Sequence, residues 1–166
     1  MTEIVPRPSP HGHCIFCEDI RFEVNAKETY VGVFGSGELF ILGRQLPTNI
    51  GKFAIKTYYC QRRTDVVAPL AIEILMPGDS DDGPSARVDI DLQEVLENLP
   101  EATDIEDPFL TIQSVFIFNP LEIKTEGLIT VRAVRDGKSY RLGRLRVKVN
   151  PTPAAPAQPP AEEAAN

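Results

Sequence analysis

The chain has 166 residues and a formal net charge of −7, and hydrophobic residues make up 42% of it. This length fits one domain with extensions, and the hydrophobic content is enough to build a core. Because tryptophan is absent, that core has to rest on Val, Ile, Leu and eight Phe residues. An acidic chain lacks the basic surface on which non-specific nucleic-acid binding depends, so no nucleic acid is expected among its partners.

The cysteines and the first residues bear on the cellular compartment. Three cysteines, an odd number, argue against a disulfide framework and favour a reducing compartment. The N-terminal residues contain no apolar run of signal-peptide length, and no window approaches the roughly 18 apolar residues of a membrane-spanning helix. The sequence therefore predicts a cytoplasmic protein without a membrane partner.

Proline marks both ends of the chain. Residues 1–11 contain three prolines, and residues 151–166 contain five prolines and no large apolar side chain. Such segments bury too little surface to offset the entropy lost on ordering. We expect a disordered extension over 1–11, a folded domain over 12–150 and a disordered, partly polyproline-II tail over 151–166.

Apolar and polar residues alternate with a period of two through most of the central domain. Glycine and proline separate the alternating runs. Strands are expected at 17–24, 29–34, 38–42, 53–60, 70–76, 86–92, 111–118 and 127–135, and in a last strand from Tyr140 to Val149.

One short segment has helical spacing instead. A helix is expected at 92–99, capped by Asp91 with Glu94 at the capping-box position and stopped by Pro100. Eight or nine short strands with almost no helix predict an all-β fold. The architecture expected is a β-sandwich of immunoglobulin-like or C2-like type.

The last hairpin can be described in more detail. Asp136-Gly137 between two alternating runs is typical of a type I′ turn. A two-residue loop at this position pairs Ala133 with Tyr140 and Val131 with Leu142.

Beyond this point the alternation changes phase. A β-bulge at Gly143 would bring the apolar residues back to one face and pair Ile129 with Leu145. The opposite face of the hairpin then gathers five basic side chains: Arg132, Arg141, Arg144, Arg146 and Lys148.

Charge is unevenly distributed along the chain. Residues 79–107 hold eleven acidic residues and one basic residue, whereas residues 124–148 hold eight basic and two acidic residues. A basic sheet face suits an anionic partner. The plainer interpretation is a solvated face, partly neutralised by the acidic segment of the same molecule or of a neighbour.

One cluster has the composition of a metal site. His11, His13, Cys14 and Cys17 combine a Cys-x-x-Cys spacing with two imidazoles, as zinc sites do. Cys60 stands alone, however, and the chain has no further histidine. On a strand Cys14 and Cys17 point to opposite faces, so the plainer interpretation is that one of them is a small buried hydrophobe. No metal or other cofactor is expected, and the cluster is kept as an alternative.

Catalysis and calcium binding are less well supported. Nucleophilic catalysis needs a base beside Ser or Cys, and both histidines lie at the N-terminal edge, so no catalytic residues and no enzyme are expected. Residues 77–84 contain three aspartates but fail the EF-hand pattern, and a solvated turn between two strands is expected there.

The stretch Cys17-Glu18-Asp19-Ile20-Arg21, with the following strand to Gly35, resembles the first hairpin of a bacterial and phage protein family. That family carries a Cys-Asp-Asp-Ile-Arg type signature, and Glu18 stands where it more often has Asp. Its members look like small β-sandwich proteins of unknown function with no catalytic residues assigned. The resemblance implies a fold and no chemistry. Asp19 is expected to satisfy backbone donors or pair with a basic residue, and Arg21 to point outward.

The leading hypothesis is a non-enzymatic β-sandwich module that acts by protein–protein contact, as an assembly or accessory protein. Its partner would be an unknown protein or a second copy of the chain. One alternative is a metal-binding protein that uses the His/Cys cluster. Another is a binder of an anionic ligand through the basic face of the last hairpin.

Overall fold

The computed structural model describes residues 9–24, 27–42, 45–63, 65, 67–98 and 109–150. The tail expected at 151–166, most of the extension expected at 1–11 and the helix stop expected at Pro100 lie outside these residues.

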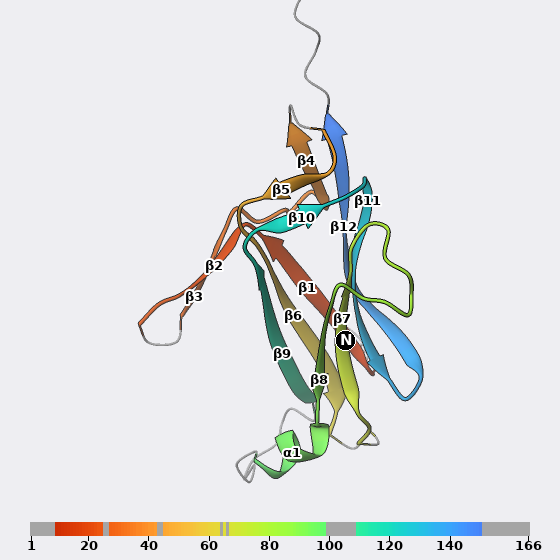
Figure 1. Cartoon of the computed structure of the whole chain (residues 1–166). Coiled ribbons are helices and arrows are strands. Elements are labelled where there is room, and N and C mark those ends of the chain that lie inside the picture. The colour runs from red at the N-terminus through yellow and green to blue at the C-terminus, as the bar shows by residue number, and fades with distance from the viewer. Residues whose placement is uncertain are drawn as a thin grey trace, which may run out of the picture.

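The described residues form an all-β, sandwich-like fold with twelve strands and one short helix (Figure 1). This confirms the predicted fold class. The elements in chain order are β1 (His11–Cys17), β2 (Asp19–Phe22), β3 (Glu28–Val31), β4 (Glu38–Leu42), β5 (Thr48–Ile50), β6 (Phe53–Arg62), β7 (Leu70–Leu75), β8 (Ala86–Ile90), α1 (Leu92–Glu97), β9 (Phe109–Phe118), β10 (Leu121–Ile123), β11 (Gly127–Arg135) and β12 (Lys138–Asn150).

Two larger sheets build the sandwich. One has the strand order β1-β6-β9, and the other has the order β4-β12-β11-β7-β8, in which only the β4–β12 pair is parallel. Two short pairs, β5–β10 and β2–β3, complete the fold. The sequence did not predict β1, β5 or β10. Strand β1 precedes the first predicted strand, at 17–24, and begins at His11, which was expected in the disordered extension. Strands β5 and β10 have three residues each, too few to show an alternating pattern.

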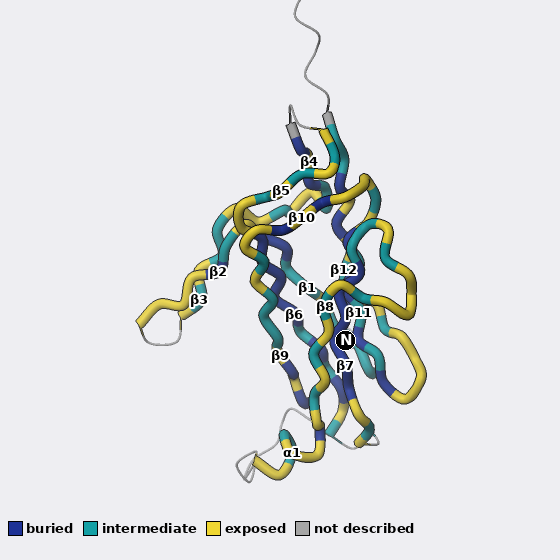
Figure 2. The backbone as a smooth tube through the Cα atoms, in the orientation of Figure 1, coloured by how far each residue is buried: buried dark blue, intermediate teal, exposed yellow. Residues whose placement is uncertain are grey.

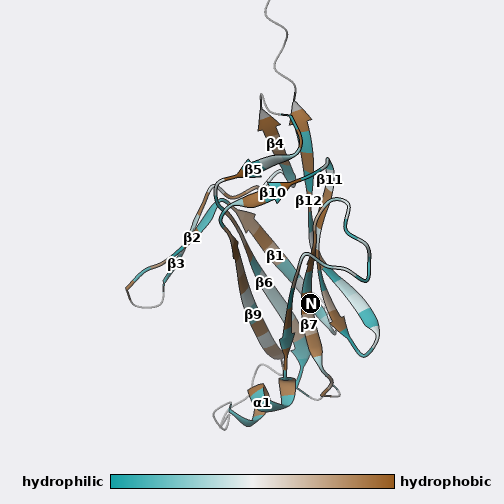
Figure 3. Ribbon diagram, viewed as in Figure 1, coloured by the Kyte–Doolittle hydropathy of each residue, from teal (hydrophilic) through white to brown (hydrophobic). Residues whose placement is uncertain are grey.

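The core lies between the two larger sheets. Phe53, Ile55 and Tyr59 of β6 are fully buried on one side, and Ile129 and Val131 of β11 are fully buried on the other (Figure 2). Residues of high hydropathy occur along the strands of both sheets (Figure 3), and their buried side chains form one core cluster. Burial of apolar surface between the sheets is the main force that stabilises such a fold.

The one helix begins as predicted. The side chain of Asp91 accepts hydrogen bonds from the backbone N–H groups of Gln93, at 2.9 Å, and Glu94, at 3.3 Å. Leu92 anchors this short helix in the core. Among the described residues no helix combines the length and the apolar character needed to cross a bilayer.

The closing hairpin confirms the predicted turn but corrects the bulge. Asp136 and Gly137 both have positive φ, 50° and 67°, as a type I′ turn requires. The pairs Ala133–Tyr140 and Ile129–Leu145 form as expected.

The predicted pair of Val131 with Leu142 is wrong. Val131 pairs with Gly143, and the extra residue of the bulge is Leu142, whose side chain lies in the core. The reason is a close approach by another strand. A Cβ atom on Gly143 would lie 2.2 Å from Sγ of Cys14, so β1 packs directly against the glycine. The bulge thus places Leu142 inward and leaves the backbone of Gly143 beneath Cys14.

The first hairpin forms as predicted, with Ile20 paired to Tyr30 and Phe22 paired to Glu28. Ile20 is buried, but Phe22 is 62% exposed and Val24 is 87% exposed. The base of the hairpin packs on the three-stranded sheet, whereas its outer part projects from the body of the domain (Figure 1). Alternation therefore identified the face that these residues share, but not how far the supporting sheet extends.

Candidate functional site

Five basic side chains share the outer face of the five-stranded sheet. The structure brings together Arg132 on β11 with Arg141, Arg144, Arg146 and Lys148 on β12, and we call this group the arginine face. Leu145 and Val147 are buried between the last three of these residues. Because side chains alternate along a strand, burial of these two residues turns their basic neighbours outward.

A row of charges crosses four strands at the centre of this sheet. Arg141 lies opposite Arg132, which lies opposite Glu73 of β7, which in turn lies opposite Arg87 of β8. The side chain of Glu73 is only 5% exposed. Its Oε2 accepts a hydrogen bond from Nε of Arg132 at 2.8 Å, and its Oε1 accepts one from Arg87. One buried carboxylate thus serves two arginines.

The loop between β7 and β8 supplies a second anion. Oδ1 of Asp81 lies 3.2 Å from Nη1 of Arg132, and the backbone carbonyl of Asp81 accepts a hydrogen bond from Nη2. The acidic segment 79–107 therefore neutralises one arginine of the face, as the sequence indicated. Sequence reasoning missed Glu73, although an isolated acid within the apolar run of β7 was a visible signal.

Three arginines of the face have a different environment. Arg141, Arg144 and Arg146 are exposed, and their side chains form no ion pair with any other described residue. Lys148 differs from them, because its Nζ donates to Oε1 of Glu38 at 2.6 Å and lies 5.5 Å from the ring centroid of Phe40. The arginines of this face that form no ion pair within the described residues therefore all lie on β12.

A hollow lies beside these arginines. The loop after β7 and the β11–β12 hairpin enclose a cavity of about 410 Å³, which we call the arginine groove. Arg132, Arg141 and Arg144 line it together with three acidic residues, Asp79, Asp81 and Glu126. Its polarity is mixed, and cations dominate on the side of β12.

The turn at 77–84 is held together by the side chain of Asp79. Oδ2 of Asp79 accepts hydrogen bonds from the backbone N–H of Met76 at 2.8 Å and from the backbone N–H and the hydroxyl of Ser85 at 2.9 and 2.7 Å. These bonds close the turn that connects β7 to β8, and they position Asp81 over Arg132. The expected turn between two strands is present.

The structure does not bring the side chains of the His/Cys cluster together as metal ligands. His13 stacks on Tyr58 with ring centroids 4.6 Å apart, and Sγ of Cys17 lies 3.7 Å from the backbone carbonyl of Ala54, to which it donates. Cys14 points the other way, into the core against Gly143. Within the part of the chain that is described, no three His, Cys, Asp or Glu side chains converge as ligands.

Cys14 is expected to react slowly with alkylating agents. Burial raises the pKa of Cys14 to about 12, and only the thiolate reacts with alkylating agents. At pH 8 we expect native Cys14 to react with iodoacetamide at least ~100-fold more slowly than an unfolded-chain cysteine. Peptide mass spectrometry after timed labelling measures this ratio. Labelling of Cys14 as fast as in urea would contradict its burial.

Asp19 and Arg21, the residues that match the Cys-Asp-Asp-Ile-Arg signature, differ in their contacts. Oδ1 of Asp19 accepts a hydrogen bond from Nζ of Lys52 at 2.9 Å, and this bond holds the pKa of Asp19 below its usual range. The side chain of Arg21 is 67% exposed and points outward. Both placements agree with the sequence-based expectation.

Comparison with known proteins finds no protein similar to this chain. No protein-family model matches the sequence, and comparisons with curated proteins and with solved structures find no significant match. The resemblance of the first hairpin to the Cys-Asp-Asp-Ile-Arg family remains a proposal based on residues 17–35. The function has to be inferred from the side chains themselves.

Proposed function

We propose that this protein is a non-enzymatic β-sandwich module that binds an acidic segment of a partner protein through the arginine face. The supporting observation is the exposed row of Arg141, Arg144 and Arg146 in a chain whose net charge is −7. Their charges lack ion-pair partners among the described residues, whereas Arg132 and Lys148 have them. Arginine also binds carboxylates through two parallel hydrogen bonds.

The spacing of the row favours an extended acidic peptide over a compact anion. Alternate residues of a strand lie about 7 Å apart on one face, so Arg144 and Arg146 match the alternate side chains of an extended chain. Asp79 and Asp81 line the neighbouring groove, and they oppose a compact ligand of high charge density. An acidic segment can place its carboxylates along β12 and avoid these aspartates.

The cysteines support a reducing location for this module. Cys14, Cys17 and Cys60 are free thiols, and such thiols persist in the cytoplasm. We therefore keep the cytoplasm as the proposed compartment.

Binding of an oligoglutamate peptide of about 12 residues, long enough to span β12 when extended, tests the proposal. Fluorescence anisotropy should detect binding that weakens between about 50 and about 300 mM NaCl, because salt screens exposed charges. Arg144→Glu with Arg146→Glu should weaken binding at least ~10-fold without changing the melting temperature.

The matched control is Lys27→Glu with Lys124→Glu, which changes the net charge equally at two exposed sites elsewhere. This control should bind nearly as well as the unmodified protein. Equal loss in both double variants, or no loss in either, would refute the proposed surface. Displacement of the peptide by millimolar inorganic phosphate would instead support the small-anion alternative.

A further inference from the structure

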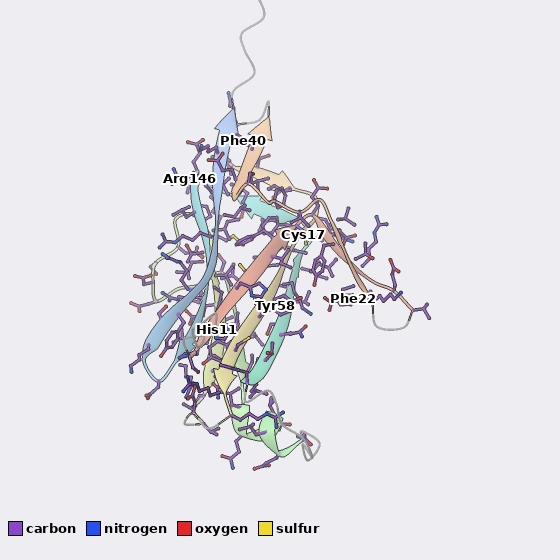
Figure 4. The ribbon with its side chains drawn as sticks, turned by 180° about the vertical axis from the view of Figure 1, so that it is seen from behind. His11, Cys17, Phe22, Phe40, Tyr58 and Arg146 are labelled. Carbon is purple, nitrogen blue, oxygen red and sulfur yellow. The ribbon has the colours of Figure 1, made fainter. Side chains whose placement is uncertain are left out.

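Two hollows follow one another along β12. The arginine groove contains the first two arginines of this strand, and a second cavity of about 510 Å³ is lined by Arg146 and Lys148. Glu126, Gly127 and Leu128 line both cavities, so the two hollows adjoin at the start of β11. Figure 4 shows Arg146 on β12, on the side away from the three-stranded sheet. We call the two hollows together the β12 trough.

The trough has an apolar wall on the side of β7. Strand β11 lies between β12 and β7, so the arginines of β12 stand on one side of the arginine groove and the end of β7 on the other. Leu75, Pro77 and Leu128 are apolar residues that line this groove. A Cβ atom added to Gly127 would lie 3.1 Å from Cβ of Pro77, which places Pro77 against the start of β11. Leu128 is 36% exposed and can therefore make a further apolar contact.

Glu126 places a negative charge where the two hollows meet. Its Oε1 accepts a hydrogen bond from the backbone N–H of Val149 at 2.5 Å, which holds the carboxylate in position. A ligand carboxylate beside Glu126 would meet a like charge, whereas one beside Arg144 or Arg146 would meet an opposite charge. The junction of the trough therefore favours an uncharged side chain, and the arginines of β12 favour acidic ones.

We propose that the acidic segment bound by the arginine face carries a large apolar residue between two acidic residues, and that this apolar side chain packs on Leu128 and Pro77. The pattern rests on the proposed function and specifies which acidic segments the site accepts. Cations on one side of the trough and apolar side chains on the other match the two kinds of side chain in such a segment.

The alternation of an extended chain fits this pattern. Successive side chains of such a chain point to opposite sides, and alternate ones lie about 7 Å apart. Arg144 and Arg146 are two residues apart on β12 and stand on the same side of β11. A peptide that runs along β11 can therefore direct residues i and i+2 at these two arginines. Its residue i+1 then points toward the apolar wall on the side of β7.

A comparison of three peptides on the unmodified protein tests the pattern. The probes are oligoglutamate of about 12 residues and two versions of it with leucine or glutamine at one central position. The leucine peptide should bind at least ~5-fold more tightly than the glutamine peptide, because the two have the same charge and only leucine buries a wholly apolar side chain. Fluorescence anisotropy of each labelled peptide measures this ratio.

Leu128→Thr tests where the apolar side chain lies. The change removes apolar surface, keeps a residue suited to a strand, and should lower the ratio to less than ~2-fold. The matched control is Ile117→Thr, which alters an exposed apolar side chain on the other sheet and should leave the ratio unchanged. Glu126→Gln should tighten binding of oligoglutamate about 2-fold, because it removes the like charge and keeps an acceptor for the N–H of Val149. An unchanged melting temperature will show that each variant folds.

The outcomes separate this pattern from the proposed function. Equal binding of the leucine and glutamine peptides would overturn the pattern, and the arginine face would stand if oligoglutamate still binds and Arg144→Glu with Arg146→Glu releases it. A leucine preference that survives Leu128→Thr would overturn the proposed contact. Failure of all three peptides to bind would refute the proposed function and the pattern together.

Discussion

Replacement of Glu73 by glutamine is expected to lower the free energy of unfolding by about 2–3 kcal/mol. The change leaves the guanidinium of Arg132, whose side chain is 17% exposed, without its buried counter-charge. Breaking a buried pair costs about 3–5 kcal/mol, and we expect less here because this site lies at the edge of solvent. Urea unfolding followed by circular dichroism measures the difference.

Asp89→Asn is the matched control for this change. Asp89 also pairs with Arg87, at 2.7 Å, but its side chain is exposed, and water replaces such a partner readily. The control should therefore leave the unfolding midpoint unchanged. An effect of Glu73→Gln as small as that of Asp89→Asn would mean that Glu73 does not hold the sheet in the way its contacts indicate.

Gly143→Ala is expected to destabilise the domain by about 2–3 kcal/mol, the upper part of the range for overpacked cores. The added Cβ would lie 2.2 Å from Sγ of Cys14, so the Cys14 side chain, or β1 and β12 themselves, would have to shift. Gly35→Ala is the control, since no heavy atom lies within 4 Å of its added Cβ, and it should have little effect. Thermal unfolding of each variant supplies the comparison.

Removal of the Cys14 sulfur should relieve this clash. Cys14→Ala combined with Gly143→Ala is expected to be more stable than Gly143→Ala alone, although Cys14→Ala by itself leaves a small cavity. The double-mutant cycle would then show a favourable interaction energy. Simple additivity would mean that Cys14 does not lie over Gly143.

The parts of the fold that the sequence predicted are those set by neighbouring residues. The Asp136-Gly137 turn depends on two residues that tolerate positive φ, and the helix start depends on a capping carboxylate at Asp91. The sequence predicted the bulge at Gly143, whereas the extra residue is Leu142. Its position depends on Cys14, which contacts Gly143 from β1, a strand distant in sequence. Likewise, the exposure of Phe22 depends on where the sheet beneath the hairpin ends.

In the candidate site, too, the sequence predicted the features set by neighbouring residues and missed those set by distant strands. Alternation along β12 was enough to place Arg144 and Arg146 on one face. It did not reveal that Glu73 neutralises Arg132, because this pair requires β7 to lie beside β11, and strand order is a long-range property. Nor did it pair Lys148 with Glu38, since that contact depends on the parallel β4–β12 ladder. Charge on a face is thus readable from sequence, whereas neutralisation of that charge is not.

The most direct test of the proposed function is to locate bound acidic peptide on the folded protein. Backbone amide shifts in ¹H–¹⁵N NMR spectra, recorded during titration with oligoglutamate, report which residues sense the ligand. We expect the largest shifts at Arg141, Arg144 and Arg146, with small shifts in the hairpin formed by β2 and β3. Absence of shifts, or shifts confined to the β2–β3 hairpin and β4, would contradict the assignment of the arginine face as the partner surface.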